Sequence, residues 1–168
     1  MPAPVDRARV LLVGEANPYG GDPDFALYPS PDGCAGHRLC CLVMGLGRAE
    51  YLRRFDRANL CPARWSGRQA KVTAWELWEE AVRLRRPAVV LFGRKVAWAW
   101  RRSGALSPFT VADDWGVKVA CLPHPSGLCR EWNVPGAFER ARAVLRGAGA
   151  LGSFPSTRRP PAGTSSTA

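Results

Sequence analysis

Four short apolar runs of strand length alternate along this chain with segments of helical periodicity. The strand-like runs are residues 9–13, 57–61, 88–92 and 117–122. The helical candidates are residues 35–44, 48–55, 66–86, 94–102 and 135–146. Strands that alternate with helices form βαβ crossovers, which place the strands in parallel and cover both faces of the sheet. The pattern predicts an α/β fold: a three-layer α/β/α sandwich around a four-stranded, mainly parallel central sheet.

The length of 168 residues suits one domain with one core, which we expect over residues 1–150. Beyond it the chain becomes rich in Ser, Thr, Pro and Gly, so residues 151–168 are predicted to form a disordered tail. No apolar run approaches the ~20 residues of a membrane span. The N-terminus lacks the apolar stretch of a secretory signal. We therefore expect a cytoplasmic monomer without membrane contact.

Basic residues outnumber acidic ones, and they are unevenly distributed. The formal net charge is +10, yet residues 1–33 contain two arginines and five acidic residues and carry −3. The rest of the chain therefore carries +13. A basic body around a locally acidic segment suits a polyanionic partner such as nucleic acid. GC-rich coding, which favours Arg, Ala, Gly and Pro, is the alternative source of this excess.

The six cysteines do not form any Cys-x-x-Cys pair, which excludes zinc-ribbon and thioredoxin-like sites by spacing. A cluster of Cys34, Cys40, Cys41 and Cys61 is the alternative that their positions leave open. Disulfides are rare in the reducing cytosol, so we interpret the cysteines as free, buried thiols. We expect neither a metal ion nor a soluble cofactor.

Two segments that follow strand-like runs carry a set of chemically versatile side chains. Residues 14–21 read Gly-Glu-Ala-Asn-Pro-Tyr-Gly-Gly, and residues 122–127 read Leu-Pro-His-Pro-Ser-Gly. Loops that follow parallel strands meet at one edge of the sheet, where ligands bind. A neutral His can donate a hydrogen bond to a developing anion, an Asn can position water or read a planar base, and a Tyr can stack on that base. The set suits hydrolysis of a bond whose leaving group is a delocalised base anion.

These two segments together resemble the motifs of the uracil-DNA glycosylase superfamily. The first is similar to the water-activating loop of that family, and the second to its His-Pro-Ser loop, which contacts the base and inserts into the duplex. Residues 33–39, Gly-Cys-Ala-Gly-His-Arg-Leu, are similar to its Gly-x-Ala-Gly-x-x-Leu helix start. The agreement covers residues 9–146 in motif order and spacing. The resemblance implies a DNA glycosylase whose partner is single- or double-stranded DNA.

The resemblance implies catalytic roles for residues in both segments. Asn17 would orient the attacking water, and His124 would stabilise charge on the departing base. Asn17 replaces the carboxylate of uracil-specific members, so Glu15 and Asp22 are alternative groups for activating the water.

Three further residues would contact the base itself. Tyr28 would stack on it, and Asn59 would hydrogen-bond its edge. Tyr19 resembles the residue that blocks thymine at C5 in uracil-specific enzymes. The loop around it is one residue longer, so the sequence does not decide whether uracil is the substrate.

The remaining matches would hold DNA. Backbone amides near glycines and a serine would bind phosphates, and Leu128 or Arg130 would wedge into the gap that the flipped base leaves. The residues expected at the DNA interface are Gly20, Gly21, Ser126, Gly127, Leu128 and Arg130.

Structural roles compete with these assignments. His124 could be a buried structural histidine, Asn17 a turn residue, and Glu15 a partner for backbone amides in its own loop. Trp75 and Trp78, at i and i+3, are expected to form one buried helix face.

Three other functions also stay open. The first is a glycosylase that removes hypermodified phage bases in defence rather than repair. The second is a non-catalytic protein that binds DNA lesions or modified bases on the same fold. The third is a nucleoside hydrolase for small molecules, which would not need a body of charge +13.

Overall fold

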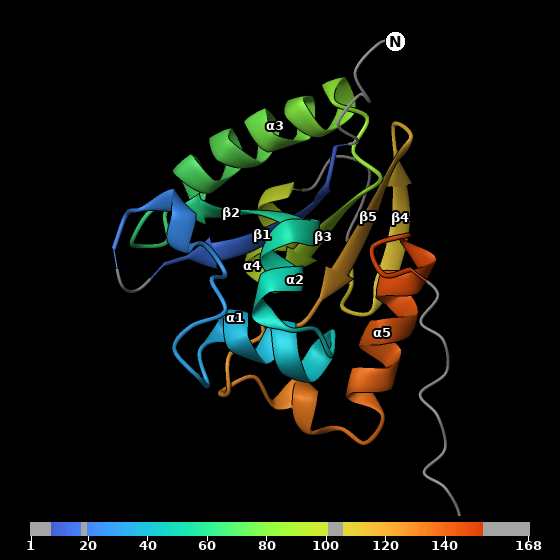
Figure 1. Cartoon of the computed structure of the whole chain (residues 1–168). Helices are drawn as coiled ribbons and strands as arrows, with labels where there is room; N and C mark the ends of the chain where they lie inside the picture. The colour runs from blue at the N-terminus through green and yellow to red at the C-terminus, as the bar shows by residue number, and fades with distance from the viewer. Residues whose placement is uncertain (1–7, 18–19, 101–105, 153–168) are drawn as a thin grey trace, which may run out of the picture.

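The structure is a computed structural model that describes residues 8–17, 20–100 and 106–152 (Figure 1). One sheet holds the strands β1 (Val10–Ala16), β2 (Phe55–Cys61), β3 (Ala88–Phe92), β4 (Thr110–Asp114) and β5 (Val117–Leu122). Their order is β2-β1-β3-β5-β4. All neighbours are parallel except β4, which pairs antiparallel with β5. The α/β class and the mainly parallel sheet are confirmed, but the expected number of four strands is wrong.

The sequence did not predict the fifth strand, β4, because this strand lies at the edge of the sheet and is mostly exposed. Its sequence, Thr-Val-Ala-Asp-Asp, lacks the apolar run of a buried strand. A two-residue turn joins it to β5, and both turn residues have positive φ, Trp115 at 54° and Gly116 at 80°. Positive φ at both positions is the geometry of a type I′ hairpin. Because a bulky Trp occupies the first of them, the sequence carries no ordinary hairpin signal here.

The first strand is longer than expected and includes part of the first motif. β1 stays paired with β2 beyond Val13, with Gly14 opposite Asn59 and Ala16 opposite Cys61. Glu15 is therefore a strand residue rather than a loop residue, because β2 continues beside it and supplies hydrogen-bonding partners.

The helices begin within two residues of their predicted starts. They are α1 (Ala35–His37), which continues as the π-helical η2 (Arg38–Val43), α2 (Arg48–Arg54), α3 (Gly67–Arg83), α4 (Arg94–Trp100) and α5 (Ala137–Gly147). Two short 3-10 helices, η1 (Pro23–Phe25) and η3 (Arg130–Asn133), lie in the loops. None of the helices in the described residues is long and apolar enough to cross a membrane.

Buried side chains of the central strands point alternately to two hydrophobic clusters. Leu12 and Val90 belong to a cluster that includes residues of η2, α2 and α5, whereas Leu11 and Val89 belong to one that includes residues of α3 and α4. Figure 1 shows α3 on one side of the sheet and α2 with α5 on the other. Leu151 is buried in the first cluster, and the rest of the expected tail, from residue 153, lies outside the described residues.

The tryptophan face expected on α3 is not a buried one. Trp75 is 48% exposed, and only Trp78 packs against the core. The buried positions of α3 are the small residues Ala70, Ala74 and Ala81. Alanines let the helix backbone approach the sheet closely, so the larger tryptophan rings lie at the margin of the contact.

The strand order sets the position of the ligand site. The chain leaves β1 for β2 on one side and continues from β3 to β5 on the other. The carboxyl ends of β1 and β3 are therefore the place where the connections diverge. Open α/β sheets bind ligands in the crevice at such a point.

Candidate active site

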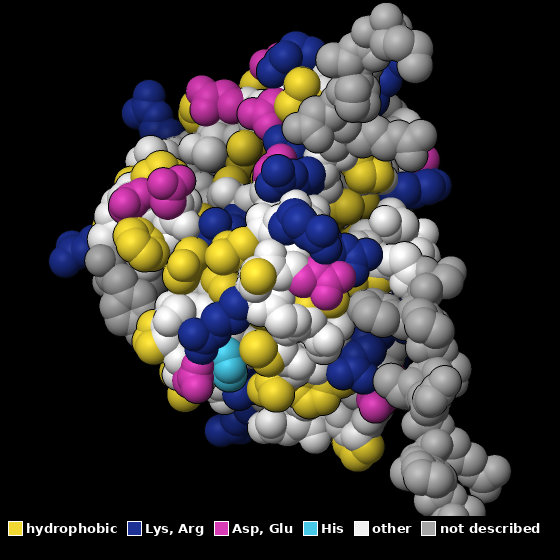
Figure 2. Space-filling model, viewed as in Figure 1, with side chains coloured by type: hydrophobic (Ala, Val, Ile, Leu, Met, Phe, Trp, Pro, Cys, Tyr) yellow, Lys and Arg dark blue, Asp and Glu magenta, His cyan; other side chains and the backbone are white. Residues whose placement is uncertain are grey.

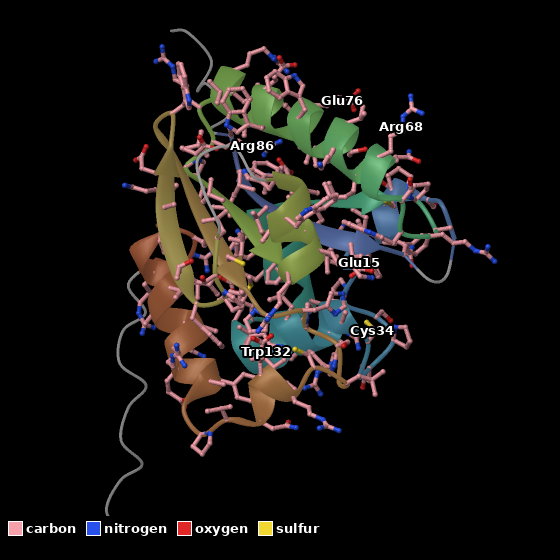
Figure 3. The ribbon with its side chains drawn as sticks, turned by 180° about the vertical axis from the view of Figure 1, so that it is seen from behind. Glu15, Cys34, Arg68, Glu76, Arg86 and Trp132 are labelled. Atoms are coloured by element: carbon pink, nitrogen blue, oxygen red, sulfur yellow. The ribbon has the colours of Figure 1, made fainter. Side chains whose placement is uncertain are left out.

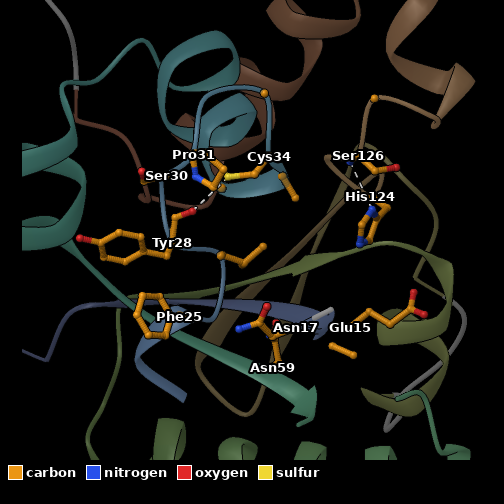
Figure 4. Close-up of a pocket in the computed structure, with 16 residues that line it drawn as sticks. Glu15, Asn17, Phe25, Tyr28, Ser30, Pro31, Cys34, Asn59, His124 and Ser126 are labelled. Carbon is orange, nitrogen blue, oxygen red and sulfur yellow. Dashed lines mark hydrogen bonds between the residues drawn. The ribbon is translucent and has the colours of Figure 1, made fainter. Parts of the chain in front are cut away.

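A cavity of about 530 Å³ lies at the carboxyl ends of the strands. Its lining comes from β1, β2, the segment around η1, the start of α1 and the loop after β5, and comprises Glu15, Ala16, Asn17, Phe25, Leu27, Tyr28, Ser30, Pro31, Gly33, Cys34, Ala35, Gly36, Asn59, His124, Ser126 and Gly127. Figure 4 shows the rings of Phe25 and Tyr28 on one side of it and His124 with Glu15 on the other. Cavities of this size hold small organic groups. The fold thus brings together most of the residues that the sequence indicated.

His124 is held as a neutral hydrogen-bond donor. Its Nδ1 accepts a hydrogen bond from the backbone N–H of Ser126 at 3.2 Å (Figure 4). A neutral imidazole that accepts at Nδ1 carries its proton on Nε2. Burial lowers the pKa of His124, Lys95 lowers it further, and Glu15 acts in the opposite direction. The ring is therefore uncharged at neutral pH and has an N–H to offer a ligand in the cavity.

Gly93 and Trp132 both lie against His124. Gly93 follows β3 with φ +99°, and a Cβ there would lie 3.2 Å from the His124 Cβ. The Trp132 Nε1 donates a hydrogen bond to the His124 carbonyl oxygen at 2.8 Å. Sequence reasoning assigned no role to either residue. Local sequence carries no signal for them, because each acts through the tertiary placement of the loop after β5.

Asn17 and Asn59 bring two amide side chains to the cavity. Asn17 directly follows β1 and is only 6% exposed. Its backbone oxygen accepts a hydrogen bond from the Gly20 N–H at 3.4 Å. Asn59 lies on β2 directly opposite Gly14. A Cβ on Gly14 would come within 2.4 Å of the Asn59 Oδ1, so a glycine is needed for the amide to fit there.

Glu15 forms an ion pair rather than bonding to its own loop. Its Oε1 lies 2.6 Å from the Nζ of Lys95, which comes from the first turn of α4. The same ammonium lies 5.5 Å from the centroid of the Trp65 ring. The carboxylate of Glu15 lines the cavity (Figure 4) and is one half of a charge pair. Lys95 is a site residue that sequence reasoning missed, because 80 positions separate it from Glu15.

Phe25 joins Tyr28 as an aromatic lining residue. Their ring centroids lie 5.5 Å apart at an interplanar angle of 72°, and Phe25 is 53% exposed. The Arg57 guanidinium lies 5.4 Å from the Tyr28 ring and donates to the Ala26 carbonyl at 2.9 Å. Nothing in the sequence distinguished Phe25 from a core residue.

The glycine-rich helix start has a steric reason. A Cβ on Gly36 would lie 2.2 Å from the Tyr28 backbone oxygen and 2.4 Å from that of Leu27. The helix start therefore packs directly on the backbone that carries Tyr28. Cys34 caps this helix and its Sγ donates to the Tyr28 oxygen at 3.3 Å.

The expected DNA-contacting residues lie around the cavity in different ways. Ser126 and Gly127 line it, and Leu128 beyond them is 93% exposed. Arg130 is exposed at the start of η3. Gly20 and Gly21 lie outside the lining.

The last two expected residues belong to the first motif or follow it directly. Tyr19 falls outside the described residues. Asp22 caps η1 by accepting from the Asp24 N–H at 3.0 Å, so its carboxylate has a local structural partner.

The cysteines are free thiols, but the expectation that they are buried holds for only three of them, Cys40, Cys61 and Cys121. Burial raises the pKa of Cys40 to about 12 and that of Cys121 to about 11, which keeps both protonated. Within residues 8–17, 20–100 and 106–152, no three His, Cys, Asp or Glu side chains gather as metal ligands would.

Charged side chains of both signs are mixed on one face of the molecule. Figure 2 shows Lys and Arg spread across the face seen in Figure 1, with Asp and Glu between them.

Comparison with models of known protein families finds no match to this chain, and comparison with curated proteins finds none either.

Proposed function

We propose that this chain is a DNA glycosylase of the uracil-DNA glycosylase type, with a three-layer α/β/α domain. It would act in the cytoplasm as a monomer, without metal or cofactor. It would flip a deaminated, damaged or modified base, such as uracil or a modified cytosine, into the cavity and hydrolyse its N-glycosidic bond. The observation that carries the proposal is the neutral His124 donor, which faces the same cavity as the amides of Asn17 and Asn59.

Each group has a role that follows from its chemistry. The His124 Nε2–H donates to the oxygen of the departing base, where negative charge grows as the glycosidic bond breaks. Asn59 offers a donor and an acceptor to the edge of the base. Asn17 orients the water that attacks the sugar carbon, and Phe25 and Tyr28 supply ring surface for stacking. The water delivers its proton to solvent or to a nearby carboxylate as the sugar hydroxyl forms.

The loop after His124 would fill the gap in the DNA. Flipping a nucleotide costs a few kcal/mol, and an apolar wedge offsets part of this cost. Leu128 suits that role because its side chain is almost fully exposed beside the cavity.

The test is release of free base from oligonucleotides that contain uracil, a thymine mismatch, hypoxanthine or a modified cytosine. We expect release from at least one, and loss of turnover with retained DNA affinity in Asn17→Ala and His124→Ala. Gln69→Ala, which removes an exposed amide on α3, is the matched control and should keep full turnover. Intact DNA binding with no release from any substrate would overturn the enzymatic proposal.

A non-catalytic reader of modified bases is the second candidate. The ion pair of Glu15 with Lys95 favours it, because a carboxylate oxygen 2.6 Å from an ammonium is occupied by that partner rather than by an attacking water. In a reader, Asn17→Ala and His124→Ala would lose base-selective binding, and the wild-type chain would show no turnover.

For a glycosylase, infection of producing cells by phages with normal or modified DNA would separate a role in repair from a role in defence.

A further inference from the structure

Arg38 is not among the residues that line the cavity, but it lies beside two segments that are, the start of α1 and Gly127. It is the first residue of η2 and follows directly on α1, whose residues Ala35 and Gly36 line the cavity. Its guanidinium extends toward the opposite wall, where its Nη1 is 3.8 Å from the position that a Cβ on Gly127 would occupy. π-helical segments such as η2 occur frequently at functional sites.

The guanidinium of Arg38 differs from the other sheltered arginines in its environment. Arg54 pairs with Glu50, and Arg57 and Arg142 donate to backbone carbonyls. The buried Arg86 bonds to two carboxylates. Arg38 is a partly buried residue, and across the described parts of the chain its guanidinium makes no hydrogen bond or ion pair with another residue.

A half-buried cation without a protein partner favours an anionic ligand. Such a group has lost part of its hydration and has gained no compensating bond. The planar guanidinium fits phosphate oxygens with two parallel N–H bonds. The neighbouring Ser126–Gly127 segment lines the same cavity, so a nucleotide held there would place its backbone beside Arg38.

We propose that Arg38 binds the phosphate next to the nucleotide that the cavity holds. This inference rests on the proposed function, because it takes the occupant of the cavity to be part of a DNA strand. The phosphate contact would orient the flipped nucleotide and would carry no base preference of its own.

The first test compares Arg38→Gln and Arg38→Lys with the control Arg68→Gln, in the whole chain. Arg68 is an exposed arginine on α3, apart from Cys34 at the cavity (Figure 3). Affinity for a fluorescent oligonucleotide is measured over a range of salt concentrations. We expect Arg38→Gln to weaken binding about tenfold and to reduce the slope of log K against log salt by about one. Arg38→Lys should recover part of the loss, and Arg68→Gln should bind within twofold of wild type.

The second test locates the phosphate. A single uncharged methylphosphonate linkage is moved along the oligonucleotide on both sides of the target base. One linkage should weaken binding to the wild type and have no further effect on Arg38→Gln, because both changes remove the same contact. Additive losses at every linkage, or equal losses in Arg38→Gln and Arg68→Gln, would overturn the inference.

The two proposals fail in different ways. Coupling between Arg38 and one linkage without any base release would retain the phosphate site and reject the glycosylase. Base release by a chain whose Arg38→Gln variant binds DNA like wild type would reject the phosphate site alone. Thermal unfolding of each variant is measured as a control, to separate a loss of binding from a loss of folding.

Discussion

The indole N–H of Trp132 holds the backbone carbonyl oxygen of His124 at 2.8 Å. The Trp132 ring in turn stacks on Phe138 of α5, with centroids 5.5 Å apart at 19°. This chain of contacts connects the loop after β5 to a helix packed in the core. The direction of the His124 ring therefore depends on the packing of α5.

Trp132→Phe should weaken both stability and turnover. Phenylalanine retains the stacking surface but leaves the His124 carbonyl without its donor, which costs about 1–3 kcal/mol of unfolding free energy. We expect turnover to fall about tenfold, as each 1.36 kcal/mol of lost transition-state stabilisation implies. Denaturant unfolding and single-turnover kinetics measure the two effects. Trp115→Phe, at a residue that is 81% exposed, is the control and should change neither.

The rate of base release should fall in acid because of His124. Its pKa lies below the ordinary 6.5, so the neutral ring predominates at pH 7 and becomes protonated only at lower pH. Protonation puts a hydrogen on Nδ1, which faces the Ser126 N–H, and this breaks the contact that orients the ring. Turnover should therefore be flat above pH 6.5 and decline below it.

The same titration affects stability. The folded chain binds fewer protons at His124 than the unfolded chain does between the lowered pKa and 6.5, so stability rises with pH through this window. The contribution is complete above pH 6.5 and is lost as the pH falls. Proton NMR of the two histidines, assigned with His37→Gln, measures the titration. A His124 midpoint at or above 6.5 would contradict the prediction.

Lys95→Met should move the acid limb of the pH profile to higher pH. Lys95 lowers the pKa of His124, and its loss also frees the Glu15 carboxylate, which raises that pKa. The His124 signal in NMR should shift its midpoint in the same direction. Lys118→Met is the matched control, because Lys118 pairs with Asp113 at 3.0 Å on the edge hairpin. Its profile should overlay that of the wild type.

Gly36→Ala should destabilise the wall of the cavity. The added methyl group would meet the backbone oxygens of Leu27 and Tyr28, which cannot move as a flexible side chain can. Overpacking of this kind costs about 1–3 kcal/mol. Thermal unfolding should show the loss, and turnover should fall with it because Tyr28 is displaced. Gly147→Ala, where a Cβ would meet no atom of the described chain within 4 Å, should be neutral or slightly stabilising.

Leu128→Ala should leave stability unchanged and weaken binding to duplex DNA. The side chain is 93% exposed, so its truncation removes little packing from the fold. Without the wedge, the cost of flipping is no longer offset, and we expect affinity for duplex substrate to fall more than affinity for single strands. Leu84→Ala, at an exposed leucine after α3, is the control. Equal losses for both strand forms would argue against a wedge.

Prediction from sequence worked best where a residue acts through its neighbours along the chain. Strand β3 and strand β5 were predicted to the residue, because β3 is a continuous buried apolar run and β5 is one that only Lys118 interrupts. β4 was missed because an exposed edge strand needs no such run. Asn59 and His124 line one cavity because the carboxyl ends of parallel strands meet at one edge, and Tyr28, which the resemblance implied, lines it too, while the roles of all three stay predictions.

The α/β class, four of the five strands and the two motif segments that meet in the cavity could be predicted from local sequence alone. The ion pair of Lys95 with Glu15, the hydrogen bond of Trp132 to His124 and the approach of Arg38 to Gly127 could not be predicted in this way. The reason is physical. Strand and helix signals arise from hydrophobic periodicity within a few residues, whereas the partner of a charged or polar group is set by which loops the sheet brings within hydrogen-bonding distance.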